Sequence, residues 1–146
     1  MYQIRIHGRG GQGVVTAAEM LALAGFMEGH NAQAFPSFGS ERTGAPVVAF
    51  ARLAPNEIRL REPVLEPDAV LIQDRTLLDS VNVFEGLRPQ GYVLINSSQT
   101  PEALGLSELV AKLPKGHVLC VPATRYALDR IGRPLPGAAC LLVLPP

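Results

Sequence analysis

The chain has 146 residues, 47% of them hydrophobic and 18% charged, a balance that fits one folded domain with a single core and excludes an intrinsically disordered chain. Its 13 basic and 13 acidic residues cancel, so no excess of positive charge is available to bind nucleic acid or an anionic membrane surface. No run approaches the ~20 apolar residues that span a bilayer, and we therefore expect a cytoplasmic protein.

The first predicted elements are a strand and a helix. Residues 2–7 form the strand, with Ile4 and Ile6 on one face and Arg5 on the other. The helix spans residues 14–26 and is apolar nearly all round, which is typical of a helix covered on two sides. We expect the sheet to cover one side and a neighbouring chain to cover the other.

An antiparallel hairpin is predicted next. A short second strand spans residues 31–35, and a loop rich in Gly, Ser and Pro spans residues 36–46. Residues 47–53 and 58–60 have the pattern of two strands, separated by a Pro-Asn-Glu turn at residues 55–57. We expect these two strands to pair with each other.

The second half of the chain alternates buried strands with helices. This alternation is typical of a parallel sheet, so the sequence predicts an α/β, Rossmann-like fold: a mostly parallel sheet flanked by helices, with an inserted antiparallel β-hairpin. The predicted strands lie at residues 69–73, 91–96 and 117–121, and the predicted helices at residues 76–84, 107–113 and 123–131.

The cysteines and histidines do not have the spacing of metal ligands. Cys120 and Cys140 are too few and too far apart for a zinc site or an iron–sulfur cluster, so we interpret them as buried free thiols. The three histidines, His7, His30 and His117, are likewise interpreted as structural. Because no catalytic dyad is recognisable, we do not expect this chain to carry out a reaction alone.

A glycine-rich loop joins the first strand to the first helix. Gly8, Gly10 and Gly13 match the spacing G-x-G-x-x-G. Glycines permit a tight turn and a close approach of the backbone, and the free N–H groups at a helix N-terminus attract an anion such as phosphate. The loop is therefore either a structural turn that seats the helix on the sheet or a site that faces a phosphate or a partner.

A nicotinamide dinucleotide is disfavoured as the ligand of this loop. Such a site also needs a carboxylate at the end of the second strand to bind the ribose. That strand ends at residues 34–35, Ala-Phe, whereas Glu28 precedes it and Glu41 lies well beyond it.

The loop after the second strand is the other candidate for function. Residues 35–46 contain two aromatic residues, two glycines and the adjacent pair Glu41 and Arg42. Because this strand should end at the same edge of the sheet as the glycine loop, both loops could line one crevice. The alternative interpretation of Glu41 and Arg42 is a solvated surface pair of little energetic value.

These two loops resemble a known family. The run GRGGQGV at residues 8–14, followed by FGSERTGAPV at residues 38–47, is similar to the gamma subunit or gamma domain of 2-oxoacid:ferredoxin oxidoreductases, the pyruvate synthase family. The second run resembles the pyruvate and ketoisovalerate branch more than the 2-oxoglutarate branch. Residues 91–97 and 123–136 also resemble the family, so the resemblance covers roughly residues 2–136.

The resemblance implies a multi-subunit enzyme that decarboxylates a 2-oxoacid on thiamine diphosphate. Such an enzyme passes electrons through iron–sulfur clusters to ferredoxin and transfers the acyl group to coenzyme A. This chain has neither a cluster-binding cysteine set nor the Gly-Asp-Gly…Asn segment of thiamine enzymes. We therefore expect thiamine diphosphate, Mg and the clusters on the partner alpha, beta and ferredoxin-like delta subunits, in a hetero-oligomer.

The resemblance also implies a role for this chain in assembly and in coenzyme A handling, with no catalytic residue or metal ligand of its own. The alternatives are a stand-alone module that binds coenzyme A or a nucleotide without oxidoreductase partners and, less favoured, a nicotinamide-dependent dehydrogenase. The residues expected to contact the cofactor are Gly8, Arg9, Gly10, Gly11, Gln12, Gly13, Ser37, Glu41, Arg42 and Asn96.

The end of the chain departs from the family pattern. After the Gly-Arg-Pro run at residues 132–134, family members usually continue with further helical sequence, whereas here Gly-Ala-Ala-Cys follows Pro136. We therefore divide the chain into a gamma-type domain at residues 1–136 and an atypical apolar tail at residues 137–146.

Overall fold

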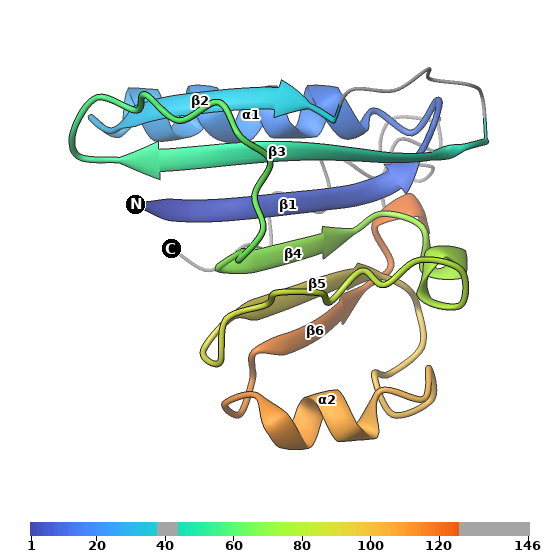
Figure 1. The fold of residues 1–146 in the computed structure, drawn as a ribbon. Helices are drawn as coiled ribbons and strands as arrows, with labels where there is room; N and C mark the ends of the chain where they lie inside the picture. Colours follow the sequence, from blue (N-terminus) through green and yellow to red (C-terminus); the bar gives the residue numbers. More distant parts are fainter. Residues whose placement is uncertain (38–43, 126–146) are drawn as a thin grey trace.

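A computed structural model describes residues 1–37 and 44–125. These residues form a mixed six-stranded sheet of order β2-β3-β1-β4-β5-β6 (Figure 1). The strands are β1 (Tyr2–Arg9), β2 (Asn31–Pro36), β3 (Pro46–Ala54), β4 (Ala69–Ile72), β5 (Tyr92–Asn96) and β6 (Val118–Val121). The helices are α1 (Val14–Met27), the 3-10 helix η1 (Arg75–Leu78) and α2 (Ser107–Lys112).

The strand directions confirm the predicted α/β class. The four strands β1, β4, β5 and β6 run parallel, whereas β3 is antiparallel to β1 and β2 is antiparallel to β3. Consequently β2 runs in the same direction as β1, and the loops that follow both strands leave the same edge of the sheet. Residues 123–125 begin a further helix after β6, and the rest of the helix predicted at 123–131 lies outside the described residues.

The hairpin forms from different strands than predicted. Residues 58–60 have no strand structure, and β3 pairs instead with β2 on one side and β1 on the other, from Asn31 opposite Ala54 and from Tyr2 opposite Leu53. Both edges of β3 are thereby occupied. Leu60, predicted to lie in the partner strand, uses its carbonyl to accept a hydrogen bond from the Gln33 side chain at 2.7 Å.

The helix predicted at residues 76–84 is also wrong, because only the single 3-10 turn η1 forms there. Asp74 caps this turn by accepting a hydrogen bond from the Thr76 N–H at 3.0 Å. Residues 80–83, Ser-Val-Asn-Val, have weak helix propensity and continue as turns.

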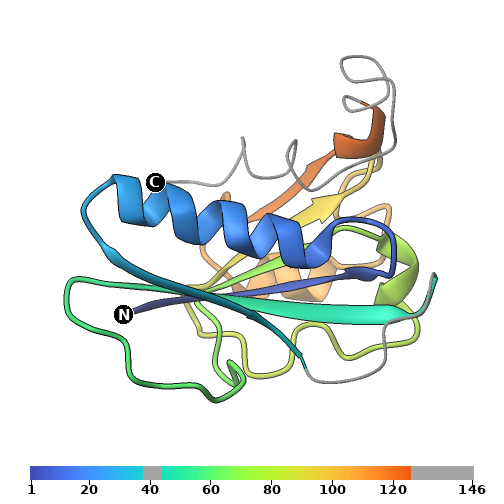
Figure 2. The same cartoon turned by 90° about the horizontal axis from the view of Figure 1, so that it is seen from above.

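The sheet has an apolar core on each face. Helix α1 covers one face, where its Ala17 and Ala18 pack against Ile4 and Ile6, as the alternation in the first strand predicted. Figure 2 shows α1 and α2 on opposite sides of the sheet. Strand β4 is buried on both faces, since Ala69 and Leu71 belong to the α1 core and Val70 and Ile72 to the core beneath η1 and α2.

Two arginines are buried beneath the connecting segments on the face opposite α1. Arg5 is 8% exposed and donates to the carbonyls of Val83 and Glu85 at 2.9 and 2.7 Å. Arg52 is 2% exposed and donates to the Glu62 carbonyl at 2.6 Å. Main-chain oxygens therefore hold the segments around residues 62 and 83–85 onto the sheet through these two cations.

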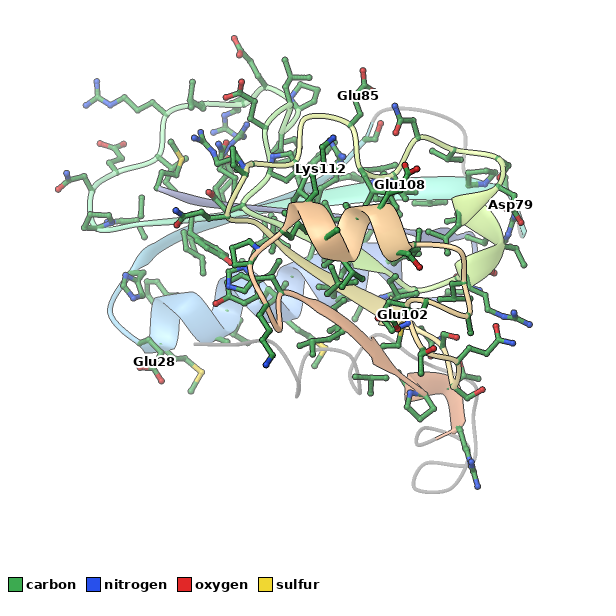
Figure 3. The ribbon with its side chains drawn as sticks, turned by 90° about the horizontal axis from the view of Figure 1, so that it is seen from below. Glu28, Asp79, Glu85, Glu102, Glu108 and Lys112 are labelled. Carbon is green, nitrogen blue, oxygen red and sulfur yellow. The ribbon has the colours of Figure 1, made fainter. Side chains whose placement is uncertain are left out.

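Charged side chains on several elements are labelled in Figure 3. The labelled acidic side chains come from separate elements around the molecule and point outward; they are Glu28, Asp79, Glu85, Glu102 and Glu108. Within residues 1–37 and 44–125, none of the helices has the length and apolar content needed to cross a membrane.

Candidate functional site

The glycine loop is a tight turn between β1 and α1. The N–H of Gly10 donates to the Ala45 carbonyl at 2.8 Å, and the N–H of Gly44 donates to the Gly10 carbonyl at 3.1 Å. Gly11 and Gly13 have φ angles of 91° and 74°, in the left-handed region that favours glycine. Residues 44 and 45, at the end of the second predicted loop, are therefore bonded directly to the glycine loop. The middle of that loop, residues 38–43, lies outside the described residues.

Gly8 sets how closely α1 approaches the sheet. A Cβ atom at this position would lie 2.4 Å from Cγ2 of Val14, the first residue of α1. Such a distance is a clash, so the missing side chain at Gly8 allows the helix to begin directly over the end of β1.

The N-terminus of α1 has no side-chain cap. Its N-cap residue is Gly13, and the first turn contains no acidic residue. The turn borders a small hollow of about 150 Å³, whose lining includes Gly10, Gly11 and Thr16. The first N–H groups of a helix and its dipole together favour an anion at such a position.

A polar network joins the glycine loop to the end of β4. Arg9 donates to the Gly44 carbonyl at 3.0 Å and to the Thr76 hydroxyl at 2.9 Å, and its Nε lies 3.4 Å from a carboxylate oxygen of Asp74. Gln12 accepts from the Arg9 N–H and donates to Asp74, both at 2.9 Å. The ends of β1, β3 and β4 are thereby held together.

The carboxyl group of Asp74 is maintained in its ionised form by this network. Burial acts to raise its pKa, but the hydrogen bonds from Thr76 and Gln12 and the charge of Arg9 outweigh burial, so that the pKa lies below its usual value. The carboxylate is neutralised by groups of the chain itself and does not present a free negative charge to a ligand.

A cleft of about 500 Å³ lies beside this network. Its walls come from the glycine loop and from the segments that follow β4, β5 and β6, the edge at which ligands bind in open α/β sheets. In Figure 1 the arrowheads of β1 and β4 point to this edge. The lining residues are Gln12, Gln73, Asp74, Arg75, Thr76, Asn96, Ser97, Ser98, Pro122, Thr124 and Arg125.

Asn96 reaches the cleft, but its amide is already engaged. Its Nδ2 donates to the Gln73 carbonyl at 2.9 Å and to the Thr124 hydroxyl at 2.6 Å, and its Oδ1 accepts from the Thr124 N–H at 3.1 Å. Asn96 thus ties the ends of β4 and β5 to the start of the helix after β6. The geometry assigns it a positioning role in the cleft wall.

The structure brings most of the predicted site residues to one edge. The run from Gly8 to Gly13 and Asn96 lie there. Ser37 directly follows the outer strand β2 at the same edge, where it is exposed and its N–H donates to the Val48 carbonyl at 2.8 Å, but it does not line the cleft. Glu41 and Arg42 lie outside the described residues.

Of the residues that line the cleft, the sequence predicted only Gln12 and Asn96 as site residues; those that it missed include Gln73, Thr76 and Thr124. Asp74 both caps η1 and bonds to Gln12 and Arg9, so it belongs to the same wall of the cleft. Their positions in the sequence could have indicated these residues, because residues directly after buried parallel strands meet at the carboxyl edge of the sheet.

The described residues offer neither a metal cluster nor an activated thiol. Within residues 1–37 and 44–125, His, Cys, Asp and Glu side chains do not gather in groups of three that could hold a metal ion. Burial, with a smaller contribution from Glu102, raises the pKa of the Cys120 thiol to about 11, so this cysteine is a protonated, packed side chain. Cys140 lies outside the described residues.

Comparison with known proteins identifies the family. The model of the pyruvate ferredoxin/flavodoxin oxidoreductase family matches residues 3–144. The chain belongs to this family. It is 50% identical over 141 residues to pyruvate synthase subunit PorC of Methanosarcina barkeri, covering 97% of this chain and 74% of that protein. It is 46% identical over 141 residues to the common gamma subunit of the pyruvate/ketoisovalerate oxidoreductases of Pyrococcus furiosus, covering 97% and 75%.

A solved structure in the family has the same fold. The pyruvate oxidoreductase subunit PORC of Thermotoga maritima superposes with a TM-score of 0.77 and 38% identity, covering 96% of this chain and 72% of that one. This oxidoreductase-family chain is therefore of the gamma-subunit type, and a gamma subunit implies further subunits. The comparisons support the interpretation as an enzyme subunit and do not support the stand-alone binding module.

Proposed function

We propose that this chain serves a cytoplasmic complex that converts pyruvate or a related 2-oxoacid to acyl-coenzyme A and passes the electrons to ferredoxin. In that complex the alpha and beta subunits carry thiamine diphosphate and Mg, and a ferredoxin-like delta subunit carries the iron–sulfur clusters. The chain itself completes the assembly and holds coenzyme A. The names of the relatives support this assignment, since they are those of subunits of a pyruvate synthase and of pyruvate/ketoisovalerate oxidoreductases.

The observation that carries the coenzyme A proposal is the convergence of two features at the carboxyl edge. An uncapped helix N-terminus borders a small hollow lined by the glycine loop, and Gln12 of the same loop lines the polar cleft of about 500 Å³. Coenzyme A combines anionic phosphates with neutral polar groups, and this edge offers N–H donors for the former and side-chain amides and hydroxyls for the latter.

The outer side of α1 supports a role in assembly. Four large apolar residues there are exposed: Met20, Leu23, Phe26 and Met27, at 42%, 59%, 68% and 79%. Leaving such a patch in water is unfavourable, and patches of this kind mark interfaces. We propose that this side of α1 contacts another subunit, so that Leu23→Glu should lower the yield of assembled complex in a co-purification while leaving the fold of the chain unchanged.

The test of the coenzyme A role is Gly11→Val in the reconstituted complex. A branched side chain at a φ of 91° strains the loop and fills the hollow, so the KM for coenzyme A should rise at least tenfold while the KM for the 2-oxoacid stays unchanged. Gly29→Val is the matched control, because Gly29 has a φ of 93° and lies past the opposite end of α1.

The two variants separate strain from ligand binding. If the KM for coenzyme A rises in Gly11→Val alone, and size-exclusion chromatography shows normal assembly, the result supports coenzyme A binding at the loop. An equal KM for coenzyme A in both variants makes the loop a structural turn and refutes the proposed role.

A further inference from the structure

Arg9 uses its whole guanidinium on groups of the chain itself. The residue ends β1, and its side chain is partly exposed. Its Nη1 donates to the Gly44 carbonyl at 3.0 Å, and its Nε and Nη2 donate to the Thr76 hydroxyl at 3.2 and 2.9 Å. Because all three nitrogens are engaged, Arg9 connects the segment before β3 to the turn after β4.

Asp74 holds this guanidinium in place. One of its carboxylate oxygens lies 3.4 Å from Nε of Arg9 and accepts from the Gln12 amide at 2.9 Å. The other oxygen accepts from the N–H of Thr76 at 3.0 Å and from its hydroxyl. Since that hydroxyl also accepts from Arg9, Asp74 supports the guanidinium both directly and through Thr76.

The segment that Arg9 holds is bonded to the glycine loop as well. The N–H of Gly44 donates to the Gly10 carbonyl, and the N–H of Gly10 donates to the Ala45 carbonyl. Three hydrogen bonds, one from the Arg9 side chain and two between main chains, therefore join residues 44 and 45 to residues 9 and 10. Of the three, only the bond from Arg9 depends on the type of side chain.

The same network joins the two features on which the coenzyme A proposal rests. Arg9 lines the hollow at the N-terminus of α1, whereas Gln12, Asp74 and Thr76 line the cleft. A change in the position of Arg9 would therefore alter how the hollow lies relative to the cleft.

We propose that Arg9 is a positioning residue of the coenzyme A site. Asp74 and Thr76 hold its guanidinium, and the guanidinium holds Gly44 against the glycine loop without binding the phosphates of the cofactor. This inference rests on the proposed function and differs, for Arg9, from the direct contact expected from the sequence. A site that is already ordered binds more tightly, because the cost of ordering it is not subtracted from the binding energy.

Neutralising Asp74 separates positioning from direct binding by the sign of the effect. If Arg9 bound a phosphate, removal of the neighbouring carboxylate would leave the arginine charge uncompensated, and the KM for coenzyme A would fall. If Arg9 positions the loop, Asp74→Asn weakens the hold on the guanidinium, and the same KM rises.

The test measures KM and kcat in reconstituted complexes that carry Arg9→Met, Asp74→Asn or both changes. Each single variant should raise the KM for coenzyme A about tenfold, with kcat and the KM for the 2-oxoacid retained. The double variant should raise it no further than Arg9→Met alone, because both changes interrupt one connection. Arg9→Lys should behave as Arg9→Met, since lysine keeps the charge but lacks the planar fork that bonds to two groups at once.

The matched control is Arg88→Met. Nε of Arg88 lies 3.3 Å from a carboxylate oxygen of Asp68, which directly precedes β4 at the opposite edge of the sheet. This variant removes an arginine–aspartate pair of nearly the same length and should keep the wild-type KM. Partly exposed ion pairs contribute little to stability, so both Arg→Met chains should fold and assemble.

Thr76→Val covers the case in which Arg9→Met fails to assemble. Valine has the shape of threonine but lacks the hydroxyl that accepts from Arg9, so this variant should also raise the KM for coenzyme A. A lowered KM in Asp74→Asn, additive effects in the double variant, or a wild-type KM in Arg9→Met or Thr76→Val overturns the inference and leaves the proposed function intact. Loss of the Gly11→Val effect refutes the proposed function separately.

Discussion

His7 makes the stability of this chain sensitive to mild acid. The ring is 4% exposed, and its Nε2 accepts a hydrogen bond from Nε of Arg5 at 2.9 Å, which requires that this nitrogen carry no proton. Burial, together with the positive charge of Arg5, lowers the pKa of His7 from 6.5 to about 4. Protonation would place a second cation beside a buried guanidinium and remove the acceptor.

The sign and size of the effect follow from linkage. Because the folded chain binds the proton more weakly than the unfolded chain, the contribution of His7 to stability is complete above pH 6.5 and is lost as the pH falls towards 4. A pKa of about 4 against 6.5 corresponds to about 3 kcal/mol in total. Between pH 7 and pH 4.5, about 2 kcal/mol of this should disappear.

Urea unfolding of wild type and His7→Gln at both pH values measures this loss. Gln keeps an acceptor for Arg5 and does not titrate, so the variant should lose about 2 kcal/mol less than wild type on acidification. His30→Gln, at an exposed position, controls for the removal of one histidine and should behave as wild type. Equal acid losses in wild type and His7→Gln would refute the reasoning.

Three further predictions concern other parts of the chain. Gly86→Ala should lower the free energy of unfolding by roughly 2–4 kcal/mol in urea titrations, because the φ of 76° is strained for alanine and its Cβ would overlap the Leu65 carbonyl; a loss below 1 kcal/mol would contradict this. Cys120, whose thiol pKa is about 11, should react with iodoacetamide at pH 8 at least tenfold more slowly in the folded chain than in urea, and equal rates would contradict its packed environment. Asn96→Ala should lower the unfolding free energy by about 1–3 kcal/mol, because it leaves the Thr124 N–H without its acceptor. Unchanged stability in urea titrations would show that the bond between Asn96 and Thr124 is not formed.

The local patterns in the sequence were sufficient to predict most elements. The first strand and α1 were predicted within two residues of their ends, since both rest on the periodicity of Ile4 and Ile6 and on the glycines that flank the helix. Strand β4 was predicted as buried on both faces from its continuous apolar run. Strand pairing was predicted less well. Residues 58–60 have a strand-like composition and were expected to pair with β3, but β2 occupies that edge of β3 instead.

The candidate site was likewise predicted only in part. The glycine spacing and the resemblance to the gamma subunits located the loop from Gly8 to Gly13 and selected Asn96, and both lie at the carboxyl edge. The engagement of Asn96 with Thr124 and that of Arg9 with Thr76 could not be predicted. They depend on distances between segments far apart in the chain.

By itself, the sequence therefore determined the class of the fold, the place of the glycine loop between a strand and a helix, and the family. Each of these depends on residues that are neighbours along the chain, where spacing translates directly into backbone geometry. Only the tertiary structure decided the partners of β3, the network of Arg9 with Asp74, and the burial of Gln73. These follow from which distant segments exclude water from one another, and that competition is settled only when the whole sheet has assembled.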